Sequence, residues 1–160
     1  LRRRIGVVIE EDGKIIFESA AIVEYICERH GGANLVPARG SDDHILYLEW
    51  LHFAEGSAMT PILLNLYTSR LGDAAAPLRP RIDHQLQSHF QYMEDSLLPS
   101  GWFVGDSLTG ADIMMSFPAE AAVKMGYPTD KPKLLAYVAA IHARPAYQTA
   151  LEKGGPYAYA

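Results

Sequence analysis

One stretch, residues 105–113, together with the apolar segment after it, constrains most strongly how this chain can fold. Within it Thr109 is followed three residues later by Asp112, which is the spacing of a capping box. The threonine hydroxyl can accept the amide of Asp112 while the carboxylate reaches back to the amide of Thr109, so a helix is expected to begin here. From Ala111 to Met125 the chain is apolar on nearly every side, and such a helix is buried. The sequence therefore predicts a buried central helix with its own amino-terminal cap.

Two roles are open to Asp112, a catalytic carboxylate or part of a helix cap. Aspartate side chains often bond the backbone where a helix starts. A negative charge in the first turn also suits the helix dipole. We therefore assign Thr109 and Asp112 to a structural capping box and expect no catalytic role for Asp112.

The first thirty residues predict a small β element followed by a helix. Two β-branched runs, Ile5–Ile9 and Lys14–Phe17, flank an Asp-Gly pair, which is typical of a tight hairpin. Two strands are not stable alone in water, so the hairpin must pack against helices or against further sheet. A helix is then expected over Ala20–His30, with Ser19 as its N-cap.

After Gly40 the spacing of apolar residues predicts helices throughout. A break is expected in the first of them near Gly56-Ser57 and Pro61. The tail from Gly154 to Ala160 is expected to be loose. The predicted fold class is therefore mostly α with a small β element. The expected helices are a long one capped by Ser41 and running to about Arg70, one over about Arg81–Leu98, the central helix over Ala111–Met125, one over about Pro132–Ala143, and a short one that starts at Pro145.

Charge and hydropathy exclude several kinds of partner. The net charge of −5 argues against nucleic acid or an anionic membrane as the main partner. No apolar run approaches the roughly 20 residues that are needed to span a bilayer. The Arg-rich start is not followed by the long apolar segment of a signal peptide, so we expect a cytoplasmic protein.

Cysteine and histidine usage also limits the chemistry. The single cysteine, Cys27, excludes internal disulfides and CxxC sites. It lies inside a predicted helix, where it is either a nucleophile or a packed thiol, and we favour the packed thiol. The six histidines form no HExxH motif and no pair four residues apart, so no metal site is expected.

Three stretches together resemble one known family. Residues 8–26, with a hairpin that ends in Glu18-Ser19 and leads into a helix, resemble the second half of the thioredoxin-like domain of cytosolic glutathione transferases. Residues 105–113 resemble the capping motif in the helical domain of that family, and Trp50–Leu66 is similar to its bacterial and fungal branch. The resemblance covers the chain from Val8 to about Leu151. It implies a partial thioredoxin-like domain at residues 1–32, followed by an all-helical C-terminal domain at residues 33–160.

The resemblance implies a glutathione site at the start of the first helix. In the family the serine hydroxyl and amide hold the γ-glutamyl carboxylate, and the acidic residue before it holds the ammonium group. Those roles fall on Ser19 and Glu18. A helix N-terminus carries free amides and partial positive charge, so it suits a carboxylate. The alternative is that Ser19 only caps the helix and that Glu18 is a solvated charge.

The sequence departs from the family at its start. The family places a cis-proline, which clamps the glutathione backbone, where this chain has Val7 after Gly6. Gly6 therefore belongs to the implied glutathione site. A cis bond before a residue other than proline costs roughly 2.5–4 kcal/mol, so this clamp is expected to be impaired. The family's first strand–helix–strand unit, with its catalytic Tyr, Ser or Cys, has no counterpart here. We therefore expect either a truncated or frame-shifted start or a fragment of a longer protein, and we assign no catalytic residue.

The expected activity is that of a glutathione transferase, in which the thiolate of glutathione, the co-substrate, attacks a small hydrophobic electrophile. A homodimer is expected as well. Two other hypotheses remain open. One is a non-catalytic module that binds glutathione or a hydrophobic molecule, or that serves in dimerisation. The other is an unrelated helical bundle with a hairpin at one end.

Overall fold

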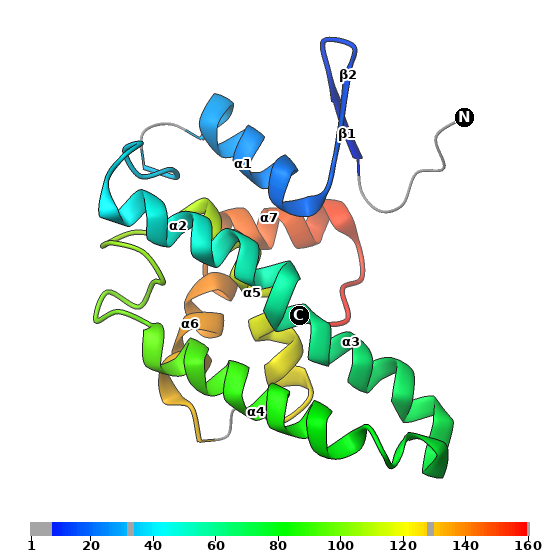
Figure 1. The fold of residues 1–160 in the computed structure, drawn as a ribbon. Helices are drawn as coiled ribbons and strands as arrows, with labels where there is room; N and C mark the ends of the chain where they lie inside the picture. Colours follow the sequence, from blue (N-terminus) through cyan, green and yellow to red (C-terminus); the bar gives the residue numbers. More distant parts are fainter. Residues whose placement is uncertain (1–7, 32–33, 128–129, 160) are drawn as a thin grey trace.

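The computed structural model describes residues 8–31, 34–127 and 130–159. It is mostly helical, with a two-stranded antiparallel hairpin at one end of a helical body (Figure 1). The predicted fold class is confirmed. The elements are β1 (Val8–Glu11), β2 (Lys14–Phe17), α1 (Ser19–His30), α2 (Asp42–Phe53), η1 (Ala54–Ala58), α3 (Met59–Thr68), η2 (Ser69–Ala75), α4 (Arg79–Ser96), α5 (Gly110–Lys124), α6 (Pro132–His142) and α7 (Pro145–Gly154).

The hairpin has the tight turn that the sequence predicts. Its register pairs Val8 with Phe17 and Glu11 with Lys14. The two turn residues, Asp12 and Gly13, both have positive φ, 50° and 76°, as a two-residue type I′ turn requires. The first strand extends two residues past the β-branched run at Ile5–Ile9, because pairing continues up to such a turn; residues 5–7 lie outside the described ranges.

Helix α1 begins one residue earlier than predicted. Glu18 is the N-cap and Ser19 is the first helical residue, so the prediction of Ser19 as the N-cap is wrong. The physical reason is the backbone of Glu18, whose φ of 77° turns the chain out of β2. The Glu18 carbonyl consequently accepts the first helical hydrogen bond, from the amide of Ile22 at 2.9 Å.

One carboxylate joins the hairpin to α1. Glu11 accepts a hydrogen bond from the Tyr25 hydroxyl and lies 2.8 Å from Nε2 of His30. The Tyr25 bond, followed by the charge of His30, lowers the pKa of Glu11 below its ordinary value of 4.5. Glu11 of β1 therefore contacts both the middle of α1, at Tyr25, and its end, at His30.

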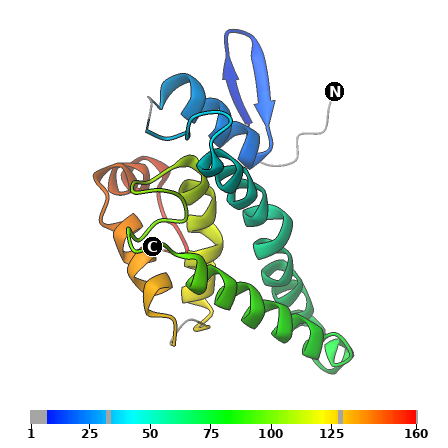
Figure 2. The same cartoon turned by 60° about the vertical axis from the view of Figure 1, so that its left-hand side comes forward.

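The long helix predicted after Ser41 is interrupted where the sequence suggests. Ser41 caps α2 by accepting the amide of His44 at 3.1 Å. The segment around Gly56 forms a π-helical turn between α2 and α3. Helix α3 then packs against α4, and Figure 2 shows the two running side by side to a common tip.

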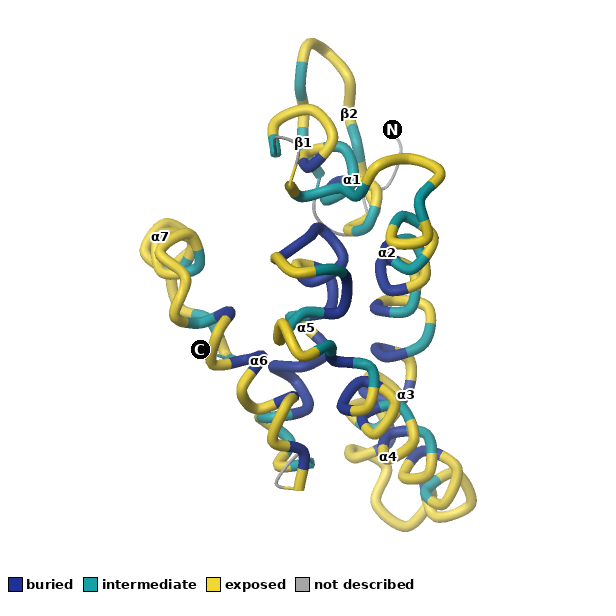
Figure 3. The backbone as a smooth tube through the Cα atoms, turned by 90° about the vertical axis from the view of Figure 1, so that its left-hand side faces the viewer, coloured by how far each residue is buried: buried dark blue, intermediate teal, exposed yellow. Residues whose placement is uncertain are grey.

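Helix α5 lies at the centre of the helical body. Figure 3 shows it buried between α2 on one side and α6 on the other, and it also packs against α1. The closest approach is at Gly110, where a Cβ atom would lie 2.9 Å from Tyr47 Oη and 3.1 Å from Cys27 Sγ. A larger residue at position 110 would therefore push α1 and α2 away from α5.

The C-terminal tail is ordered against α5, so the prediction of a loose tail is wrong for residues 155–159. The Tyr157 hydroxyl donates to the buried carboxylate of Glu120, which also lies 2.9 Å from Nε2 of His142. The Tyr159 ring packs edge-on against Phe117, with the ring centroids 5.5 Å apart. None of the helices in the described ranges is long and apolar enough to cross a membrane.

Candidate functional site

The sequence-predicted pair Glu18 and Ser19 lies at the exposed start of α1, directly after β2. The helix begins at Ser19, so the amides of Ser19, Ala20 and Ala21 have no carbonyl partner within the helix. Glu18 makes no side-chain bond to the helix, and the first turn of α1 holds no acidic residue. The partial positive charge of this helix end is thus available to an anion from solution.

The backbone of Glu18 is strained. A residue other than glycine with φ of 77° and ψ of 122° pays on the order of 1–3 kcal/mol. Such strain is concentrated at ligand and active sites, where the surrounding structure holds it in place. Here the strained residue carries an exposed carboxylate next to free helix amides, which is an arrangement suited to a ligand with both an ammonium and a carboxylate group.

The other residues implied at the glutathione site, Gly6 and the neighbouring Val7, lie outside the described ranges. Cys27 is 2% exposed, and burial raises the pKa of its thiol. A buried thiol of raised pKa is a poor nucleophile, which agrees with the packed role expected for it. The Tyr47 hydroxyl beside it is fully buried, and burial raises its pKa too.

The Thr109–Asp112 pair forms the core of the central helix cap. The carboxylate of Asp112 accepts the amide of Thr109 at 2.8 Å and the hydroxyl of Thr109 at 3.0 Å, within a capping box. Asp112 is 0% exposed, and burial is the main reason that its pKa is raised. No substrate can reach a carboxylate in that position, so its role is structural.

Two partners of this cap are not apparent from the sequence. The other oxygen of Asp112 accepts the amide of Phe103 at 2.9 Å. The Tyr137 hydroxyl on α6 donates to the backbone carbonyl of Asp112 at 2.6 Å. The cap therefore joins the loop before α5 and helix α6 as well as starting its own helix, and no local spacing rule marks such distant partners.

Metal chemistry has no visible support in the side chains that the structure describes. Within residues 8–31, 34–127 and 130–159, no three His, Cys, Asp or Glu side chains gather in a way that could hold a metal ion.

Comparisons with known proteins agree with the fold. The family model described as "Glutathione S-transferase, C-terminal domain" matches residues 58–154. Glutathione S-transferase 1 of Saccharomyces cerevisiae is 26% identical over 159 residues, covering 88% of this chain and 67% of the relative. Glutathione S-transferase 3 of Schizosaccharomyces pombe is 26% identical over 169 residues, covering 91% of this chain and 66% of the relative. The chain thus spans about two thirds of the length of these relatives.

Solved structures of glutathione S-transferases also superpose on this chain. A glutathione S-transferase from Actinobacillus pleuropneumoniae superposes with a TM-score of 0.82 at 30% identity, covering 95% of this chain and 70% of the other. The bacterial beta-class glutathione S-transferase of Sphingomonas chungbukensis superposes with a TM-score of 0.74 at 24% identity, covering 92% and 73% of the two chains. The second likeness supports the fold alone.

Proposed function

This chain belongs to the glutathione S-transferase family, and we propose that it binds glutathione at the start of α1. The exposed, strained Glu18 beside the free amides of the helix is the observation that carries the proposal. Ser19 holds the γ-glutamyl carboxylate through its hydroxyl and its amide, and Glu18 pairs with the ammonium. Gly6 belongs to the same proposed site. The proposal includes a division into a glutathione-binding part at residues 1–32 and a helical domain at residues 33–160.

The proposed reaction joins glutathione to a small hydrophobic electrophile. The glutathione thiolate supplies the electron pair of the new carbon–sulfur bond, and the leaving group departs with its own bonding pair. The contribution of Glu18 and Ser19 is to bind and orient the co-substrate. Binding that is equal in the ground and transition states does not raise turnover, so a group that stabilises the thiolate is needed as well.

We infer that this stabilising group comes from outside the 160 residues. Of the thiol and phenol groups on or beside α1, Cys27 and Tyr47 are buried, and the Tyr25 hydroxyl already donates to Glu11. The curated relatives are longer than the matched region by about a third of their own length. A donor aimed at the sulfur is typically worth a factor of roughly 10²–10³ in rate, so we expect the 160-residue chain to conjugate a chloronitrobenzene at close to the uncatalysed rate.

The test measures glutathione binding by calorimetry in Ser19→Ala and in a matched control, Ser107→Ala. Ser107 is also exposed but lies outside any helix. A hydrogen bond to a charged group is worth about 1.5–3 kcal/mol, so Ser19→Ala should weaken binding by roughly 10- to 100-fold. Ser107→Ala should bind as the unmodified chain does. Equal affinities of the two variants would contradict the site.

A second arm measures conjugation by the 160-residue chain and by a chain extended upstream with its own coding sequence. Activity only in the extended chain is the expected result. Substantial turnover by the 160 residues would show that a residue within them activates the thiol. Binding without turnover in both chains would favour the alternative, a non-catalytic glutathione-binding or dimerisation module.

The proposal also includes a homodimer in the cytoplasm. Apolar side chains remain exposed on the hairpin and on the outer faces of α1 and α2, among them Phe17 at 46%, Ile26 at 41% and Ile45 at 58%. A second copy that covers this surface would remove it from water. A reducing compartment suits a protein that depends on glutathione and whose single cysteine is free.

A further inference from the structure

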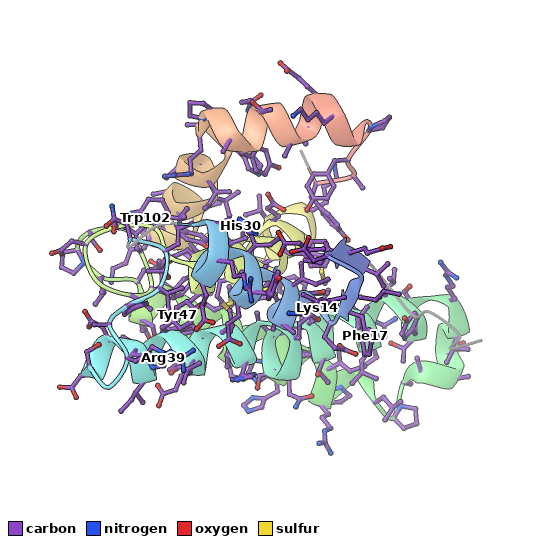
Figure 4. All side chains as sticks on the ribbon, turned by 90° about the horizontal axis from the view of Figure 1, so that it is seen from above. Lys14, Phe17, His30, Arg39, Tyr47 and Trp102 are labelled. Carbon is purple, nitrogen blue, oxygen red and sulfur yellow. The ribbon has the colours of Figure 1, made fainter. Side chains whose placement is uncertain are left out.

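A polar groove lies on the helical body, between α4 and the segment that leads into α6. Its volume is about 560 Å³, which is in the range of small-molecule pockets. Figure 1 shows α4 and the start of α6 at the opposite end of the molecule from β1 and β2. Figure 4 views the molecule from the hairpin end, with Lys14 and Phe17 above the helical body. This α4 groove therefore lies far from the hairpin, and it shares no residue with the proposed glutathione site.

One wall of the groove is a polar face of α4. Four lining side chains share one side of the helix, because they recur at intervals of three and four residues: His84, Gln87, Ser88 and Gln91. An imidazole, a hydroxyl and two primary amides present both hydrogen-bond donors and acceptors. This wall is therefore matched to a ligand that is rich in hydrogen-bonding groups, and an apolar ligand would leave these groups without partners.

The opposite wall holds a buried lysine. The side chain of Lys131 is 9% exposed, and its Nζ lies 3.0 Å from Oε1 of Gln91 and 3.2 Å from Oδ1 of Asp130. An ammonium group has three donors, and no third hydrogen bond from this one is found within residues 8–31, 34–127 and 130–159. A buried donor without an acceptor is costly, so a ligand oxygen in the groove would stabilise the lysine.

The charges at the groove do not favour an ionic ligand. Lys131 is paired with Asp130, and the hydrogen bond from the lysine is the first cause that lowers the pKa of Asp130 below its ordinary value of 3.8. The amides of Lys133 and Leu134 at the start of α6 already donate to Glu94, at 3.0 Å and 2.7 Å. A neutral molecule whose hydroxyls both donate and accept matches the ammonium and the carboxylate together.

An aromatic pair adds an apolar surface. The rings of Phe90 and Tyr127 have centroids 5.6 Å apart, with their planes at 58°. Phe90 is fully buried, whereas Tyr127 is half-buried and lines the groove with it. Burial is the main reason that the pKa of Tyr127 is raised above 10.0, so its hydroxyl remains a donor at neutral pH. Tyr127 thus offers an apolar ring with a polar tip, and a sugar ring likewise has C–H groups on its faces and hydroxyls at its rim.

We propose that the α4 groove binds a neutral sugar of one or two rings. Nζ of Lys131 and Oδ1 of Asp130 are 3.2 Å apart, so neighbouring hydroxyls of one ring reach both: one accepts from the ammonium and the other donates to the carboxylate. A face of the sugar packs against Tyr127, and a further hydroxyl bonds the side-chain amide of Gln87. Sugar binding is independent of glutathione binding, because the two sites have no residue in common.

Saturation-transfer NMR with glucose, galactose, mannose, maltose and sucrose tests the site, with and without excess glutathione. The test variant is the double substitution Gln87→Leu and Asp130→Asn, at two exposed residues of the groove. Its matched control is Gln85→Leu and Asp106→Asn, at residues that do not line the groove. We expect the test variant to weaken sugar binding by at least about tenfold, because it loses two hydrogen bonds, one of them to a charged group. The control should bind as the unmodified chain does.

Several results would overturn the proposal. These are the absence of saturation transfer to all five sugars, equal sugar affinities in the two double variants, and displacement of the sugar by glutathione. Inorganic phosphate should not compete with the sugar, and competition would identify an anion site instead. Circular dichroism checks that both double variants are folded. If the test variant is not, Gln87→Leu is compared with Gln85→Leu, and the expected loss is then several-fold.

Discussion

Replacing Asp112 by alanine tests the link between the central helix cap and global stability. The two oxygens of the Asp112 carboxylate make two separate sets of hydrogen bonds. One oxygen accepts the amide and hydroxyl of Thr109, at 2.8 Å and 3.0 Å, and thereby starts α5. The other accepts the amide of Phe103 at 2.9 Å and so holds the preceding loop. Asp112→Ala removes all three hydrogen bonds from a site that is 0% exposed.

The expected loss is larger than that of an ordinary cap. Loss of a cap costs about 0.5–2 kcal/mol. A backbone amide left buried without an acceptor, here that of Phe103, costs about 1–3 kcal/mol more. The two penalties fall on different backbone groups, so Asp112→Ala should lower the free energy of unfolding by roughly 2–5 kcal/mol, a large share of the roughly 5–15 kcal/mol typical of native proteins.

Urea denaturation followed by circular dichroism measures this loss. The matched control is Asp106→Ala, an exposed aspartate in the same loop, whose replacement should change the free energy of unfolding by less than about 0.5 kcal/mol. Thr109→Val removes only the hydroxyl and leaves the bonds of Asp112 to the amides of Thr109 and Phe103, so it should cost less than Asp112→Ala. An Asp112→Ala chain as stable as Asp106→Ala would refute the reasoning, since three buried hydrogen bonds would then contribute nothing.

Two further predictions concern pH and assembly. The pKa of Glu11 is lowered in the folded state, first by the Tyr25 hydroxyl, so its contribution to stability is present above pH 4.5 and is lost as the pH falls below that value. In acid titrations of the denaturation midpoint, Glu11→Gln should therefore flatten this part of the stability profile, whereas Asp12→Asn should not. Parallel profiles for Glu11→Gln and the unmodified chain would contradict the contact. Light scattering at micromolar concentration should give a mass of about twice 17.6 kDa or more, and Ile45→Glu should shift it toward the monomer; a monomer in the unmodified chain would reject the proposed dimer.

Short-range patterns in the sequence were enough to predict most of the elements. The Asp12-Gly13 turn, the Ser41 cap and the Thr109–Asp112 box each involve residues at most a few positions apart, and their structural effect is local. The π-helical turn around Gly56 was expected as a break for the same reason. The order of these motifs was also sufficient to indicate the family.

Contacts between distant residues could be decided only by the tertiary structure. Glu94 on α4 is an example, because its buried carboxylate accepts the amides of Lys133 and Leu134 and caps α6 from a distance of about 40 residues. The tail lies on α5 because Glu120 is buried and needs donors, which Tyr157 and His142 supply.

The backbone at the candidate site was decided in the same way. Ser19 has the residue type of an N-cap, yet the cap is Glu18, because the packing of the hairpin and α1 sets where the chain must turn. Residue preferences could not predict the strain at Glu18, because they disfavour a positive φ for glutamate. Local interactions determine which helices and strands form, whereas burial and long-range hydrogen bonds determine which backbone groups are left free to bind a ligand.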